Sequence, residues 1–304
     1  MRALNTLEEW FLGPADPRAY ASLRIGYGVA CLAVLADLWP LRHALLSSSG
    51  MFGGAPAGPA LNVFAWVRSD TGVTITMLFF ALAIVCLTLG LFQRVAAAAA
   101  FVWVSSYSAT AAIALSGFDT ILRVVGFVLV ISPAVPTWTV RRGGPPSPER
   151  PPAAYGLRLV QWQVLLIYAC TVWLKAPDPF WRSGAAVPYF LMSMFARHPT
   201  AGAAHLGAIG AILTYGTLLV ESSVPFLLWV RKTRWLGVGL GAGLHIGIAM
   251  TSELALFTLA MLPLYAAYFE AEDFDRIARW IGFHSRRPWY RFAPRFGRER
   301  NSAG

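Results

Sequence analysis

Apolar segments of about 20 residues, separated by short polar turns, recur along most of this chain. A helix of that length crosses the hydrocarbon core of a membrane. The pattern therefore predicts an all-α fold, a polytopic transmembrane helix bundle with about eight spans. The predicted spans cover residues 17–38, 73–92, 95–115, 119–133, 157–174, 206–230, 235–250 and 254–269.

Polar residues and prolines between these segments predict the domain organisation. Asp16 followed by Pro17 is typical of the start of a helix. We expect an amphipathic N-terminal segment at 1–15, a transmembrane domain at 16–270 and a basic cytoplasmic tail at 271–304. The apolar stretch 185–195, after the fifth span, is too short to cross a membrane; it could re-enter the bilayer or lie at its interface.

The composition supports a membrane protein and excludes a soluble globular enzyme. Of the 304 residues, 57% are hydrophobic and 13% are charged, whereas an ordinary soluble domain has roughly 25% charged residues. No metal site is predicted, because the five histidines show neither HxH nor HExxH spacing.

The net charge of +10 does not indicate nucleic-acid binding, because the basic residues flank the spans. With eight spans, 19 of the 25 Lys and Arg residues lie on the side of the two termini. Cytoplasmic loops carry such an excess, so we expect both termini in the cytoplasm and a multi-pass protein of the inner (cytoplasmic) membrane. Membrane lipids are then its expected partners, and nucleic acid is not.

Ionisable side chains inside apolar spans are informative because a charge in hydrocarbon needs a partner or a cavity. Arg24 and Glu221 lie at a similar distance from the cytoplasmic ends of the first and sixth spans. We therefore predict a structural ion pair between them, with a proton pathway as the alternative.

Three further ionisable residues mark the fourth and seventh spans. Asp119 and Arg123 have the i, i+4 spacing that lets them pair along one helix face, and Asp119 could instead cap the start of its helix. His245 lies on a glycine-rich helix, where it is either a buried neutral side chain bonded to a neighbour or part of a cavity lining.

Lys175 carries the strongest chemical hypothesis. The chain has 23 arginines and two lysines, and only lysine readily loses its proton when it is removed from water. Tyr168 and Trp181 lie close to it in the sequence, on either side. The alternative is a lysine that reaches the membrane interface, with Trp173 and Trp181 as interfacial anchors.

The order of these motifs resembles the HTTM family, the membrane domain shared with the vitamin K-dependent γ-carboxylases. The most specific part is Tyr168-x6-Lys175 followed by Trp181 and Gly184. Weaker matches occur in the same order: Arg24 with Asp37, Gly117 to Arg123, Gln161, Glu221-x3-Pro225 and Leu244 to Ala249.

The resemblance implies an enzyme-like role in which Lys175 is the base that deprotonates a quinol such as vitamin K hydroquinone. Tyr168 and Trp181 would then shape the pocket, while Asp119, Arg123 and His245 would orient or polarise the substrate. A secreted or periplasmic protein could be the partner. The alternatives are a non-catalytic quinone- or lipid-binding subunit, a maturation partner of a secreted protein and, third, a transporter.

Overall fold

A computed structural model describes residues 2–51, 61–111, 115–140 and 151–282. These residues form helices and contain no β-strand, so the predicted all-α fold is confirmed for the described part of the chain. The chain divides into two compact units, Met1–Tyr268 and a second unit that begins at Phe269 and contains the short helix α13 (Ala271–Trp280).

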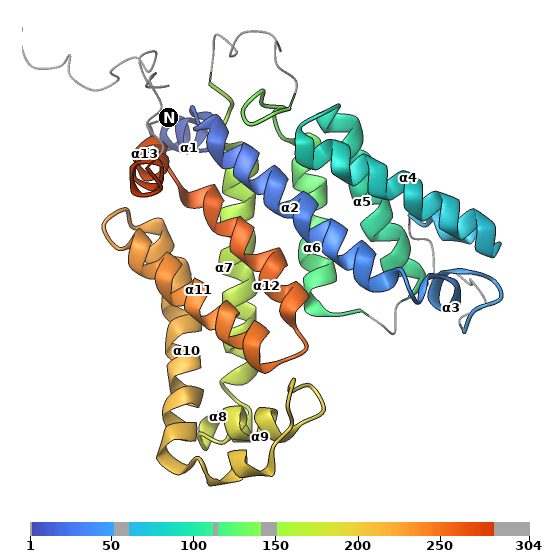
Figure 1. The fold of residues 1–304 in the computed structure, drawn as a ribbon. Coiled ribbons are helices and arrows are strands. Elements are labelled where there is room, and N and C mark those ends of the chain that lie inside the picture. Colours follow the sequence, from blue (N-terminus) through green and yellow to red (C-terminus); the bar gives the residue numbers. More distant parts are fainter. Residues whose placement is uncertain (1, 52–60, 112–114, 141–150, 283–304) are drawn as a thin grey trace, which may run out of the picture. The chain divides into compact units, whose positions relative to one another are not determined.

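Each segment that the hydrophobic pattern predicted as a span coincides with a helix (Figure 1). These helices are α2 (Pro17–Leu38), α4 (Asp70–Leu89), α5 (Gln93–Thr110), α6 (Gly117–Ile131), α7 (Tyr155–Lys175), α10 (Gly207–Trp229), α11 (Arg234–Thr251) and α12 (Ala255–Met261), which continues as the 3₁₀ helix η4 (Leu262–Tyr268). Shorter helices are α1 (Arg2–Leu12), α3 (Arg42–Leu46), α8 (Pro179–Arg182) and α9 (Ala186–Met192), with 3₁₀ turns η1 (Val63–Ala65) and η3 (Ala201–His205).

Four of the described helices are both long and apolar enough to cross a membrane: α2, α4, α7 and α10. The other predicted spans are helical but shorter or less apolar. Length and composition therefore establish a membrane protein with several apolar helices.

The start of α2 follows from its sequence. Asp16 is the N-cap, and its carboxylate accepts a hydrogen bond from the Arg18 backbone at 2.8 Å. Pro17 occupies the first turn, where a missing N–H costs nothing. The predicted helix start is confirmed.

Two glycines let α2 pack closely against neighbours on opposite sides (Figure 1). A side chain at Gly26 would collide with Pro263 of η4, and one at Gly28 would collide with Thr88 of α4. Two residues along a helix rotate the side-chain direction by roughly 200°. As a result, α2 lies between the α4–α5–α6 group and the α12–η4 segment, which in turn contacts α7 and α11.

The stretch 185–195, predicted to re-enter the membrane or lie at its interface, contains the short helix α9, which follows α8 and lies beside the start of α10. Asp178 caps α8, and α9 follows after Gly184. The Thr214 hydroxyl of α10 donates to the Gly184 carbonyl at 2.9 Å and accepts from the Val187 backbone at 3.1 Å. These bonds fix the short helices to α10; their depth in the bilayer stays a prediction.

The predicted ion pair between Arg24 and Glu221 is wrong. Arg24 is 3% exposed, and its guanidinium donates to the carbonyls of Leu87, Thr88, Thr137 and Trp138 at 2.8 to 3.3 Å. The first two carbonyls belong to the last turn of α4, which carries partial negative charge, and the Leu87 carbonyl also accepts from the Gly90 backbone at 3.0 Å. The two residues are not neighbours, because α2 packs on α4 whereas α10 packs on α7 and α11.

Candidate functional site

Three motif residues of α7 share one face of that helix. Gln161, Tyr168 and Lys175 are seven residues apart, and seven residues are about two helical turns. The Gln161 amide donates to the Ala267 carbonyl at 2.7 Å, and the Tyr268 hydroxyl donates to the Gln161 carbonyl at 3.0 Å. These bonds attach the first half of the face to η4, so that its second half is directed toward α10 and α11.

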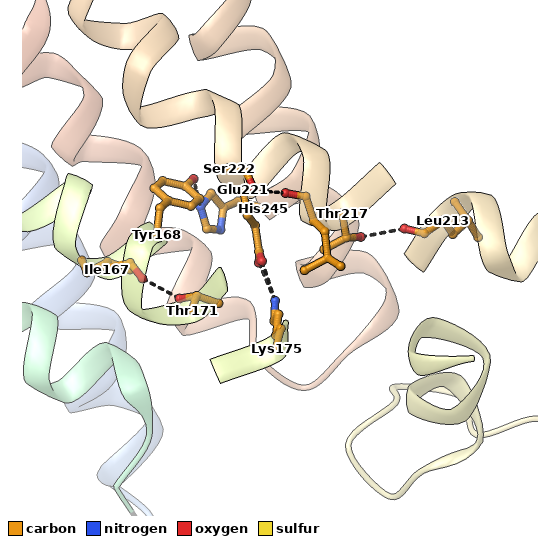
Figure 2. Close-up of polar contacts among 10 residues, drawn as sticks. Ile167, Tyr168, Thr171, Lys175, Leu213, Thr217, Glu221, Ser222 and His245 are labelled. Carbon is orange, nitrogen blue, oxygen red and sulfur yellow. Dashed lines mark hydrogen bonds and ion pairs between the residues drawn. The ribbon is translucent and has the colours of Figure 1, made fainter. Parts of the chain in front are cut away.

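Lys175 forms an ion pair with Glu221 of α10 (Figure 2). Its Nζ donates to both carboxylate oxygens, at 2.6 and 2.8 Å. Glu221 is 5% exposed, whereas the Lys175 side chain is 22% exposed. A buried carboxylate needs such a partner, because an isolated charge in an apolar environment is costly. Lys175 is thus a half-buried amine at the surface of the bundle and not a freely solvated one.

The chain turns sharply after Lys175 and returns Trp181 to it. Pro177 follows the last turn of α7, and the Asp178 carboxylate accepts from the Phe180 and Trp181 backbones at 2.9 and 3.2 Å. Nζ of Lys175 then lies 4.4 Å from the centre of the Trp181 ring, a cation–π contact. The ammonium therefore lies between a carboxylate and an aromatic face.

A second polar group, made of Tyr168, His245 and Tyr265, lies next to this pair. The Tyr168 hydroxyl is 2.9 Å from His245 Nε2 and 2.6 Å from the Tyr265 hydroxyl. His245 is 2% exposed, and Figure 2 shows its ring and that of Tyr168 beside Glu221. Its Nδ1 has no hydrogen-bond partner among the described residues, and a buried polar atom in that state calls for an explanation.

The glycines of α11 make room for this group. A side chain at Gly241 would collide with the Tyr265 ring, and one at Gly237 would press on the backbone of α10 at Leu228. Gly239, Gly243 and Gly247 face open space. Of the glycines in α11, Gly237 and Gly241 therefore allow close packing of this helix against α10 and η4.

Asp119 has a structural role that its sequence position only partly predicted. Ser116 precedes the helix as the N-cap, and Asp119 lies in the first turn, where its carboxylate accepts from the Ser116 backbone at 2.6 Å. The Tyr107 hydroxyl also donates to it. Arg123 is exposed on α6. Within the described ranges, neither residue has a hydrogen bond or ion pair to Lys175, Glu221 or His245.

We expect Asp119→Ala to lower the free energy of unfolding by about 2 kcal/mol, because it removes a helix cap and leaves the buried Tyr107 hydroxyl without an acceptor. Arg123→Ala is the matched control, since its side chain is exposed. Thermal denaturation of the purified protein in detergent measures both. Equal melting temperatures for the two variants would contradict the structural role of Asp119.

Sequence reasoning placed Glu221 with the wrong partner and missed Tyr265. Chain order could have indicated the correct partner of Glu221. Consecutive helices are usually neighbours, and the fifth and sixth spans, which carry Lys175 and Glu221, follow each other. Tyr265 carries no such cue: it lies in an apolar segment, and only the packing of η4 against α7 brings its hydroxyl to Tyr168.

No group of three or more His, Cys, Asp or Glu side chains that could hold a metal ion occurs in the part of the chain that the structure describes. The site is therefore built from an amine, a carboxylate, an imidazole and aromatic rings.

These features define an all-helical membrane protein with a lysine–carboxylate pair at the surface of its bundle. A family model for the HTTM domain matches residues 13–272, and the chain belongs to the HTTM family. The resemblance to the membrane domain of the γ-carboxylases is consistent with that family. No curated protein and no solved structure matches the chain.

Proposed function

We propose that this protein is an eight-span protein of the inner (cytoplasmic) membrane, with both termini in the cytoplasm, that acts on a quinol or another weakly acidic, lipid-soluble substrate. Eight helices at the predicted positions and the basic residues on one side support the topology. Lys175 is the proposed base. The observation that carries this proposal is its half-buried amine, held between Glu221 and Trp181.

The surroundings of Lys175 favour a substrate that arrives from the bilayer. Trp173, Leu174 and Leu219 are large apolar side chains that are 70 to 80% exposed, which is typical of a surface that contacts lipid. The Lys175 side chain is itself 22% exposed, so part of it lies at that surface. The planar ring of a quinol could stack near Trp181 and place one of its hydroxyl groups within hydrogen-bond distance of Nζ.

His245 is the second proposed contact. Its unpartnered Nδ1 is the kind of polar atom that a ligand hydroxyl would satisfy, and Tyr168 holds the ring through Nε2. Within the described residues, three of the predicted site residues, Tyr168, Trp181 and His245, are therefore grouped around Lys175. The roles predicted for Asp119 and Arg123 have no contact with that group to support them.

The resemblance suggests carboxylation of a secreted or periplasmic protein as the overall reaction. A non-catalytic quinone- or lipid-binding subunit is the alternative, and the ion pair itself favours it, because a carboxylate at 2.6 Å stabilises the charged form of the lysine. In that case only a positive charge is needed at position 175. Arginine at position 175 could therefore support the non-catalytic function but not the catalytic one.

We expect Lys175→Ala to weaken binding of 1,4-naphthohydroquinone at least tenfold, and Lys232→Ala to leave it unchanged. Lys232, the other lysine, is exposed and follows α10 on its cytoplasmic side in the proposed topology, so it is the matched control. Binding is measured by quenching of tryptophan fluorescence in detergent under anaerobic conditions. Equal affinities for the two variants would exclude Lys175 from the ligand site.

Lys175→Arg separates the two functions. Arginine keeps the charge but does not release a proton in a protein, so it should retain binding and abolish deprotonation of the bound quinol. The anion is followed by its ultraviolet absorption. Full deprotonation by the arginine variant would contradict the base role and support the non-catalytic subunit.

A further inference from the structure

We propose that Glu221 accepts a proton from the Lys175 ammonium, so that the freed amine can take the proton of the substrate and the two side chains act as one base. This inference rests on the proposed function. The geometry that points to it is a carboxylate with both oxygens on one amine, itself held at the edge of the bundle.

Lys175 by itself is poorly prepared to act as a base. An ammonium ion has no lone pair, and a carboxylate at 2.6 Å stabilises that charged form. The amine must therefore lose a proton before it can accept one. Glu221 is the acceptor in direct contact with Nζ, and the Lys175 amine is the hydrogen-bond donor that faces the carboxylate among the described residues.

The proton balance follows from this contact. One Nζ–H bond breaks and one Oε1–H bond forms along the 2.6 Å hydrogen bond, which leaves a neutral amine and a neutral carboxyl group. The amine lone pair then takes the proton of a substrate hydroxyl, whose O–H bond breaks. The products are a substrate oxyanion, a Lys175 ammonium and a protonated Glu221, and no electrons are gained or lost.

The electrostatics of the apolar environment favour this route. Before the reaction the ammonium is balanced by the Glu221 carboxylate, and afterwards it is balanced by the substrate oxyanion. One ion pair replaces another, so no unpaired charge is created in a region of low dielectric constant. Transfer of the proton to lysine alone would instead leave two anions, the carboxylate and the oxyanion, beside one cation.

Among the described residues, the neighbouring rings of Tyr168, His245 and Tyr265 form no hydrogen bond with Lys175. His245 Nε2 faces the Tyr168 hydroxyl, and the Tyr168 hydroxyl also contacts that of Tyr265. Figure 2 shows that Nζ of Lys175 contacts the Glu221 carboxylate and not these rings. The rings of Tyr168 and His245 lie beside the Glu221 carboxylate (Figure 2).

Infrared difference spectroscopy tests the inference on the purified full-length protein, under anaerobic conditions. On addition of 1,4-naphthohydroquinone, the wild type should form the bound anion, show the carbonyl band of a newly protonated carboxyl group and release no proton to a pH indicator in the medium. Glu221→Gln should lack that band and release one proton for each anion formed. Glu253→Gln, at an exposed carboxylate, should behave like the wild type.

The outcomes distinguish this inference from the function on which it rests. If the wild type forms the anion, shows no carboxyl band and releases a proton, Glu221 is not the acceptor and the base role of Lys175 stands. If the wild type binds naphthohydroquinone without forming its anion, or does not bind it, the proposed function fails and the inference fails with it. The wild-type measurement decides both points even if Glu221→Gln does not fold.

Discussion

Replacing Arg24 by alanine should lower the free energy of unfolding by about 4 kcal/mol. The guanidinium donates to four backbone carbonyls, two in the last turn of α4 and two at Thr137 and Trp138. Each hydrogen bond from a charged group contributes about 1.5 to 3 kcal/mol, and a buried carbonyl left without a donor costs about 1 to 3 kcal/mol. Arg24 also joins three parts of the chain, so no local rearrangement can supply all the donors.

Arg94→Ala is the matched control, because Arg94 is exposed at the start of α5. The stability of Arg24→Lys should lie between those of Arg24→Ala and Arg94→Ala. An ammonium keeps the charge, but it lacks the planar fork with which the guanidinium reaches all four carbonyls. Thermal denaturation in detergent measures all three variants. If Arg24→Ala and Arg94→Ala have the same melting temperature, the buried guanidinium does not stabilise the fold as described.

The helices could be predicted because an apolar chain in a membrane has few alternatives. Every backbone group must be satisfied within the protein, so a long apolar segment becomes a helix. Local signals then set its start, as Asp16 and Pro17 do for α2. The lateral neighbours of each helix were not predictable in the same way, because they depend on small residues such as Gly26 and Gly28, whose contacts are not visible from spacing.

The proximity of candidate residues could be predicted where they lie on one element or close together in the chain. Tyr168 and Lys175 share a face of α7, and Trp181 follows after a turn that Pro177 and Asp178 produce. The partner of Lys175 was not predictable from position within each helix, because the helices do not begin and end at the same level. α10 begins beside α8 and α9, beyond the end of α7, so the fifteenth residue of α10 reaches the last residue of α7 (Figure 1).

Removing Lys175 alone should destabilise the protein by about 3 kcal/mol, whereas removing both members of the pair should restore most of that loss. Lys175→Met leaves the carboxylate of Glu221, which is 5% exposed, without its counter-charge. The double variant Lys175→Met/Glu221→Leu replaces the pair by apolar side chains of similar volume, which is often neutral or stabilising for buried pairs. Thermal denaturation in detergent compares the wild type, both single variants and the double variant.

Naphthohydroquinone binding should not recover with stability in the double variant. If the double variant is as stable as the wild type and does not bind, the pair contributes its chemistry to the site and little to the fold. If it is as unstable as Lys175→Met, the pair is structural, and its place at the end of α7 needs no ligand to explain it. The two measurements together therefore decide whether a charged pair at the edge of an apolar bundle, where hydrophobic residues would pack equally well, is present for its protons.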